Sequence, residues 1–162
     1  MKDVFDVKRS ADSDDVLKKV NGQYIGVVDI TAATYTVEDI QSGTHFTLNK
    51  ADGIVVTLPV AEPGLTYTFS IGTTFTGTFS LDAAQTSDLY IGTLIMSDKD
   101  APGTVSLKQF HPDGSDDDKI VMDGDDNGRF VGGIIKLTCT ALNRWHVDGY
   151  VFGDGTLVSP FA

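Results

Sequence analysis

The stretch "MDGDDNGRF", residues 122–130, places oxygen-bearing side chains at the spacing of a calcium loop. Asp123, Asp125, Asn127 and Gly128 match the opening pattern D-x-[DN]-x-[DN]-G. Carboxylate and amide oxygens are the ligands that the hard cation Ca²⁺ takes. These residues therefore pose a choice between a calcium site and an acidic loop that joins two strands.

The second half of this loop does not continue the calcium pattern. The twelfth position, where a calcium loop needs a bidentate Glu, falls on Ile134, and both flanks resemble strands. Further oxygen ligands could come from residues 116–118 if the two acidic loops fold together. The sequence therefore favours a solvated acidic hairpin loop whose Asn and Gly residues permit positive φ. The three oxygen-bearing residues remain candidate calcium ligands, and no other cofactor is expected.

The remaining reactive side chains do not form a recognisable catalytic pattern. The three histidines are scattered, without the spacing of a zinc site. Cys139 alternates inward in an expected strand and is predicted to be a core residue rather than a nucleophile. A glycosidase needs two carboxylates in a cleft, whereas the acids here gather in loops such as "DGSDDDK". The chain is therefore expected not to be an enzyme.

Aromatic residues could serve sugar binding in place of catalysis. Trp145, Tyr90 and Tyr150 could form a platform on which sugar rings stack. Trp145, however, shares its parity with Val147 and Val151 along one strand, which predicts a core position for it.

The net charge of −11 is unevenly distributed along the chain. Residues 1–19 carry five basic and five acidic side chains, so residues 20–162 hold 18 acids against 7 bases. A body this acidic repels phosphate backbones, and binding to nucleic acid is not expected. No apolar run approaches the roughly 18 residues of a membrane span, and the start lacks the apolar region of a secretory signal.

Period-two alternation dominates from Gln23 onward. Strands are expected in segments such as "THFTLN", "GIVVTLP", "LYIGTLIM", "KIVMD", "GIIKLTCTA" and "RWHVDGYVFG". "LTYTFSIG" and "TFTGTFSL" alternate most clearly, and residues 72–74 are expected to join these two segments as a hairpin. Pro63-Gly64 predicts a type II turn, and a further turn is expected near Asn143. The sequence thus predicts an all-β fold, an antiparallel β-sandwich or barrel-like sheet of about ten short strands.

Residues 1–22 differ from this pattern and are expected to form a separate arm. They are charged, with short apolar islands, and are predicted to be partly ordered or to form a short helix over "SDDVLKKV". Residues 23–162 are expected to form a single all-β domain.

The order of segments resembles structural proteins of tailed bacteriophages. In "TYTVEDIQSGTHFTLNKADGIVVTLPVAEPGLTYTFSIGTTFTGTFSL", a "G-x-x-F-T-L-N" strand precedes "V-T-L-P", "G-x-x-Y-T-F" and a Thr/Gly-rich segment. The end of the chain, with "W-x-V-x-G" and a terminal "PF" followed by a small residue, is similar too. The resemblance covers about residues 30–162, and its pattern recurs in capsid decoration (cement) proteins and in fibre-like appendages.

The resemblance implies a non-enzymatic virion protein on the outer surface of the capsid, made in the host cytoplasm. Its expected partner is the major capsid protein, and its expected assembly is a homo-oligomer, a trimer, because a capsid offers three-fold sites and closed oligomers hide strand edges. The arm would supply the contact through Val4, Phe5, Val7, Lys8 and Arg9. The alternative role is a receptor- or glycan-binding module of a head or tail fibre.

Overall fold

Alternating apolar and polar residues form eleven β-strands in the computed structural model, which describes residues 26–99 and 106–162. The strands are β1 (Val27–Ile30), β2 (Thr34–Thr36), β3 (His45–Leu48), β4 (Ile54–Thr57), β5 (Thr66–Ile71), β6 (Phe79–Asp82), β7 (Leu89–Asp98), β8 (Leu107–Phe110), β9 (Lys119–Met122), β10 (Ile134–Ala141) and β11 (Arg144–Gly153). Two 3-10 helices, η1 (Asp39–Gln41) and η2 (Asp125–Asn127), lie in loops.

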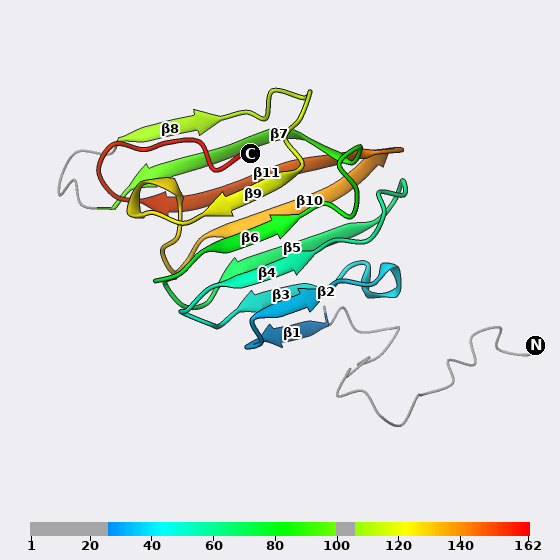
Figure 1. Cartoon of the computed structure of the whole chain (residues 1–162), viewed down its shortest axis with the longest axis horizontal. Coiled ribbons are helices and arrows are strands. Elements are labelled where there is room, and N and C mark those ends of the chain that lie inside the picture. Colours follow the sequence, from blue (N-terminus) through cyan, green and yellow to red (C-terminus); the bar gives the residue numbers. More distant parts are fainter. Residues whose placement is uncertain (1–25, 100–105) are drawn as a thin grey trace, which may run out of the picture.

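The strands form two sheets that lie over one another (Figure 1). The larger sheet has seven strands in the order β1-β3-β5-β10-β11-β7-β8, and the smaller has four in the order β2-β4-β6-β9. One apolar core fills the space between them. The predicted all-β sandwich is therefore confirmed, with eleven described strands where about ten were expected.

The sheets are mixed, however, and the expectation of a purely antiparallel arrangement is wrong. β1 with β3, β3 with β5, β2 with β4, β4 with β6, and β7 with β11 all pair in parallel. Between β1 and β6 the chain changes sheet at every strand, so each of β1 to β4 hydrogen-bonds to the strand two places further on. Parallel neighbours need a crossover, and here a strand of the opposite sheet supplies it.

The expected hairpin at residues 72–74 is wrong for the same reason. β5 belongs to the larger sheet and β6 to the smaller, so the two strands face each other across the core. The inward sides of both were predicted correctly, since Phe69 and Phe79 are buried. Alternation defines which side of a strand is buried, but it does not define the strand's hydrogen-bonding partner.

Two predicted turns are confirmed. In the turn Glu62–Leu65, the amide of Leu65 donates to the carbonyl of Glu62 (3.3 Å), and Gly64 has φ +102°, as a type II turn requires. The hairpin between β10 and β11 turns at Asn143, which has φ +58°.

The core is rich in aromatic side chains. Trp145 is fully buried and packs against Tyr67, with ring centroids 5.8 Å apart, while Phe46 stacks on Phe69 at 5.1 Å. Cys139 lies beside Trp145 in the β10–β11 register and is buried. The predicted core positions of Trp145 and Cys139 are therefore confirmed.

The segment after β11 closes one edge of the smaller sheet. Val121 of β9 donates its amide to the carbonyl of Pro160 (2.7 Å), and Lys119 exchanges two backbone hydrogen bonds with Ala162 (2.9 and 3.1 Å). This pairing satisfies groups that an edge strand would otherwise expose to other chains.

The expected arm, residues 1–22, lies outside the described residues, as do the contacts predicted for Val4, Phe5, Val7, Lys8 and Arg9. Within residues 26–99 and 106–162, no helix has the length and apolar character to span a membrane.

Candidate functional site

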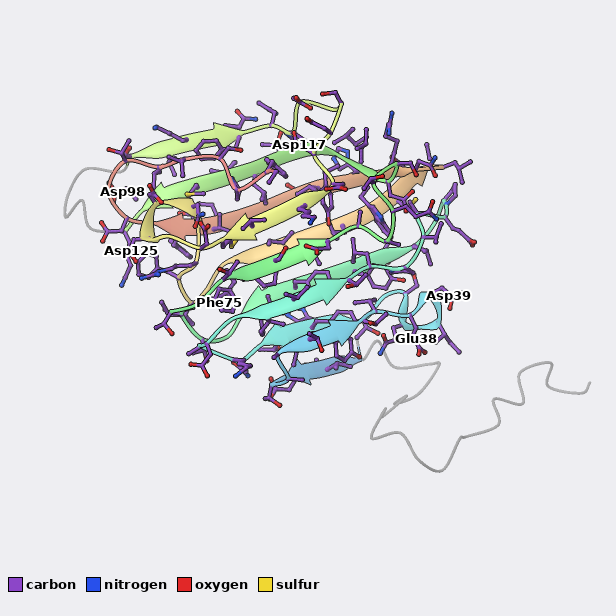
Figure 2. The ribbon with its side chains drawn as sticks, viewed as in Figure 1. Glu38, Asp39, Phe75, Asp98, Asp117 and Asp125 are labelled. Atoms are coloured by element: carbon purple, nitrogen blue, oxygen red, sulfur yellow. The ribbon has the colours of Figure 1, made fainter. Side chains whose placement is uncertain are left out.

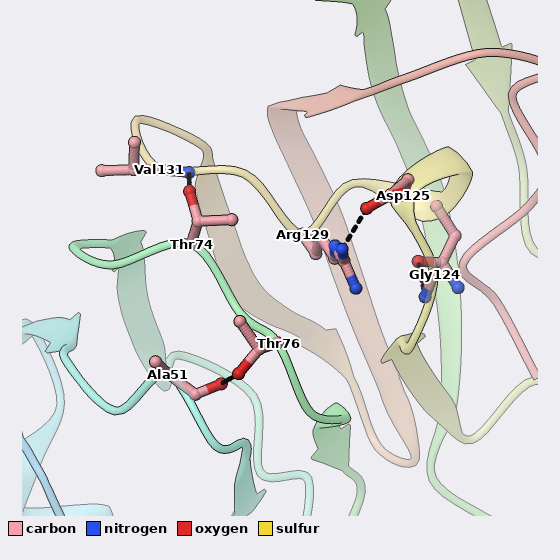
Figure 3. A network of polar contacts seen from close by, with 8 residues as sticks. Ala51, Thr74, Thr76, Gly124, Asp125, Arg129 and Val131 are labelled. Carbon is pink, nitrogen blue, oxygen red and sulfur yellow. Dashed lines mark hydrogen bonds and ion pairs between the residues drawn. The ribbon is translucent and has the colours of Figure 1, made fainter.

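The candidate calcium loop follows directly from β9 and is closed by its own side chains. Asn127 is buried, and its Nδ2 donates to Oδ1 of Asp123 (2.7 Å) while its Oδ1 accepts from the amide of Gly124 (3.0 Å). Asp125 forms an ion pair with Arg129 (Figure 3). Each of the three candidate ligands thus has a partner within the protein, and a calcium ion would have to replace these interactions.

The backbone of this loop also ties distant segments together. The carbonyl of Asp125 accepts from the amide of Asp154 (2.7 Å), and the carbonyl of Asp126 accepts from Val158 (3.0 Å). Further along, the amide of Val131 donates to Oγ1 of Thr74 (3.1 Å; Figure 3). The loop therefore connects β9, the segment before β6 and the segment after β11, which is a structural role.

A second acidic loop brings together Asp113, Asp116 and Asp117, whose carboxylate oxygens lie within 4.8 Å of one another. Oδ1 of Asp113 accepts from the amide and the hydroxyl of Ser115 (2.7 and 2.8 Å), and these bonds lower the pKa of the Asp113 carboxyl. Asp117 accepts a hydrogen bond from the amide of Asp113. These carboxylates are held by a local turn on the surface.

The two acidic loops do not fold together. Asp117 lies well apart from Asp125, which is at the left of the view in Figure 2, and the one potential ligand group found among the described residues contains neither Asp123 nor Asp125. The condition under which residues 116–118 could supply further ligands to this loop is therefore not met. The reason is topological, because the four residues of β9 separate these loops along the chain and in space (Figure 1).

A shallow depression lies at the end of the sandwich that carries η1. It has a volume of about 370 Å³ and is lined by Glu38, Asp39, Pro59, Val60 and Glu62. Its carboxylates belong to exposed residues, and the described lining contains no imidazole, thiol or cationic side chain. The depression is open, so its carboxylates stay solvated, and it lacks the concave, enclosing form of a small-molecule site.

Two further candidates are buried in the core. Tyr90 is fully buried, its hydroxyl donates to the carbonyl of Leu81 (3.0 Å), and burial raises its pKa well above the usual range. Tyr90 is therefore not available for sugar stacking, and that expectation is wrong. Sγ of Cys139 lies 3.2 Å from the carbonyl of Ala141, and burial raises the pKa of this thiol.

The histidines do not gather at one place. Nε2 of His45 is 2.9 Å from Oγ of Ser70, and Nδ1 of His111 is 3.1 Å from the carbonyl of Gly92. His146 is exposed on β11. No histidine belongs to the potential ligand group found in the described part of the chain.

The outward side of the seven-stranded sheet is a surface that the sequence alone did not single out. We call it the outer face; it consists of the outward-pointing side chains of β1, β3, β5, β10, β11, β7 and β8. Residues in register cross all seven strands in one row: Asp29, Thr47, Ser70, Ile134, Tyr150, Ile95 and Gln109. The alternation of each strand was visible in the sequence, but only the strand order places these residues side by side.

The outer face is neutral, although the body is acidic. Its strands carry two acids, Asp29 and Asp148, and two bases, Lys136 and Arg144, at outward positions. The rest of segment 20–162 therefore holds 16 acids against 5 bases. The excess negative charge thus belongs to the remainder of the molecule, chiefly to its loops.

Comparison with known proteins assigns no family. No protein-family model, no curated protein and no solved structure matches this chain. Function is therefore inferred from the residues and their geometry.

Proposed function

We propose that this chain is a non-enzymatic capsid decoration (cement) protein of a tailed bacteriophage. It binds the major capsid protein on the outer surface of the virion as a homotrimer and stabilises the head. The segments "THFTLN", "VTLP" and "YTF", and the terminal "PFA", support the proposal through their resemblance to structural proteins of such phages.

One structural observation carries the proposal. The best-formed depressions in the described part of the chain are shallow and open, whereas the outer face is broad, regular and uncharged overall. Small-molecule sites are concave and enclose most of their ligand. A flat strand surface suits contact with other proteins, which is the task of a shell-stabilising subunit.

The sandwich also has the rigidity that such a subunit needs. The aromatic core is continuous between the sheets, and the segment after β11 seals the β9 edge. A body that does not deform can hold neighbouring shell subunits at fixed positions, because little of the binding energy is spent on ordering it.

Attachment to the shell is assigned to residues 1–22. This arm contains five of the twelve basic residues, with Val4, Phe5 and Val7 as apolar anchors and Lys8 and Arg9 beside them. It precedes β1, an edge strand of the larger sheet. Arms of this composition can bind by adding a strand to a partner sheet.

The test uses co-sedimentation of the purified protein with phage heads that lack it. Deleting residues 1–20 is expected to lower head affinity by at least tenfold, on the order of 1.4 kcal/mol or more. K8E/R9E is expected to weaken binding, whereas the matched charge reversal K18E/K19E is expected to leave it nearly unchanged. Full binding after the deletion would refute the role of the arm. Absence of binding by the intact, folded protein would refute decoration itself.

A receptor- or glycan-binding fibre module is the second candidate, favoured by one observation. Tyr150 is 39% exposed on the outer face and packs edge-on against Phe152, with ring centroids 4.8 Å apart. Exposed aromatic rings can stack on sugars. Specific binding on a glycan array that disappears in Tyr150→Ala would favour this role over decoration.

A further inference from the structure

The outer face carries an apolar row at its centre. Ile134, Tyr150 and Ile95 are direct neighbours in register on β10, β11 and β7, and each is 39–41% exposed. Phe152 follows Tyr150 on the outward side of β11 and is in register with Ser97 of β7. Leu107 of β8, which is 56% exposed, is the partner of Ser97 on the other side and so belongs to the same outward row. Contiguous exposed apolar side chains on a sheet whose other side is already buried mark a contact surface.

Charge identifies which partner fits this surface. A basic partner would prefer the acidic loops, where most of the net charge of −11 resides. A second copy of this chain is itself acidic, so two copies repel one another over most orientations. The outer face, with two bases and two acids on its strands, is a surface on which copies can meet without that repulsion.

The polar residues beside the apolar row also suit contact between copies. Lys136 and Asp148 are cross-strand partners on β10 and β11, two residues along each strand from Ile134 and Tyr150 and on the same side of the sheet. A surface that presents both a cation and an anion next to an apolar centre can set Lys136 of one copy opposite Asp148 of the next copy around a three-fold axis. Hydroxyl side chains of Thr68 and Thr93 continue this rim on β5 and β7.

The size of the face is adequate for a stable assembly. Six strand spacings of about 4.8 Å give a width of roughly 29 Å, and eight residues of β10 give a length of roughly 27 Å. Since β1, β3 and β8 are shorter, the usable surface is on the order of 600–800 Å². Stable protein interfaces bury about 800 Å² per partner.

We propose that copies of this chain associate through the outer face, with Ile134, Tyr150 and Ile95 at the centre of the contact. In the trimer of the proposed function, the three outer faces turn toward the common axis. The inference rests on the homo-oligomeric part of that function and not on capsid binding.

The experiment is sedimentation velocity on the purified full-length chain, without heads or other proteins. Wild-type protein is expected to be oligomeric at about 10 μM. Ile134→Glu and Tyr150→Glu each place a charge in the apolar row and are expected to raise the dissociation constant at least thirtyfold. Val55→Glu is the matched control, because Val55 is also 39% exposed but lies on β4, on the outside of the smaller sheet.

Salt dependence gives an independent readout. Since the bodies around the contact repel one another, raising the salt from about 50 to 500 mM is expected to strengthen association by screening this repulsion. A wild-type monomer at about 100 μM would overturn the proposal. Equal dissociation by Val55→Glu and Ile134→Glu, with both variants folded by circular dichroism, would overturn it as well. A chain that assembles through another surface and still binds heads would leave the decoration function standing.

Discussion

Gly92 offers a sharp test of the pairing between β7 and β11 in the larger sheet. It lies in the middle of β7, opposite Val147 of β11, and its φ is +108°. A Cβ at this position would collide with the carbonyl oxygen of Val147 and lie 3.0 Å from its nitrogen. Gly64 is a matched control, because its φ is +102° but no atom lies within 4 Å of the corresponding Cβ position.

The losses in the free energy of unfolding caused by Gly92→Ala and Gly64→Ala should therefore differ only by the cost of the collision with Val147. Positive φ costs an alanine roughly 1–2 kcal/mol at either site. In Gly92→Ala, β7 and β11 must also separate locally, which weakens about two ladder hydrogen bonds worth roughly 0.5–1.5 kcal/mol each. We expect a loss of about 3–4 kcal/mol in the free energy of unfolding for Gly92→Ala, against about 1–2 kcal/mol for Gly64→Ala.

The assay is guanidinium unfolding followed by fluorescence. Trp145 is the only tryptophan and is fully buried, so its emission reports loss of the core. The midpoint should fall markedly more in Gly92→Ala than in Gly64→Ala, with similar slopes. Equal losses in the two variants would refute the close parallel pairing of β7 with β11.

Three further predictions concern the core, the β9 edge and the acidic loop. Burial raises the pKa of Tyr67 to about 12 and raises that of Tyr90 well above its usual range, so both rings favour the neutral form when folded. Their contribution to stability is full below pH 10 and is lost as the pH rises through the folded pKa. The denaturant midpoint of the wild type should therefore fall between pH 10 and 12. The midpoint of Tyr67→Phe should fall less over the same range. Deleting residues 159–162 removes three backbone hydrogen bonds from β9 and should lower the free energy of unfolding by about 2–4 kcal/mol. Light scattering on heating should increase, because the β9 edge becomes free to pair with other chains. Unchanged stability would contradict the sealing of this edge. Because Asp125 is paired with Arg129, calcium at about 5 mM should shift Tm by less than about 1 °C; a larger rise that disappears in Asp123→Asn would restore the calcium site.

The sequence predicted the strands and their buried sides well, because the period of two is a local property. Phe69, Leu137 and Trp145 are inward as their parity required. The arrangement of strands was not predictable in the same way. A connection such as residues 72–78 can close a hairpin or cross to the opposite sheet, and the alternation on either side is identical in both arrangements.

The candidate sites show the same division between local and distant information. The incomplete calcium pattern was visible in the sequence, and so was the missing Glu at Ile134. The pairing of Asp125 with Arg129 depends on η2, a turn too short to be anticipated from propensity. The outer face was less predictable still, because Ile95 becomes a neighbour of the Ile134–Tyr150 pair only once β7 pairs in parallel with β11.

The most direct test of the proposed decoration function is to look for the protein on intact particles of the tailed phage that, under this proposal, encodes it. Particles are labelled with a gold-conjugated antibody against the purified chain and imaged by electron microscopy. The proposed function predicts gold distributed over the whole surface of the head. Gold confined to the tail or to one vertex would contradict decoration and assign the chain to a fibre, and particles without label would contradict a place in the virion altogether.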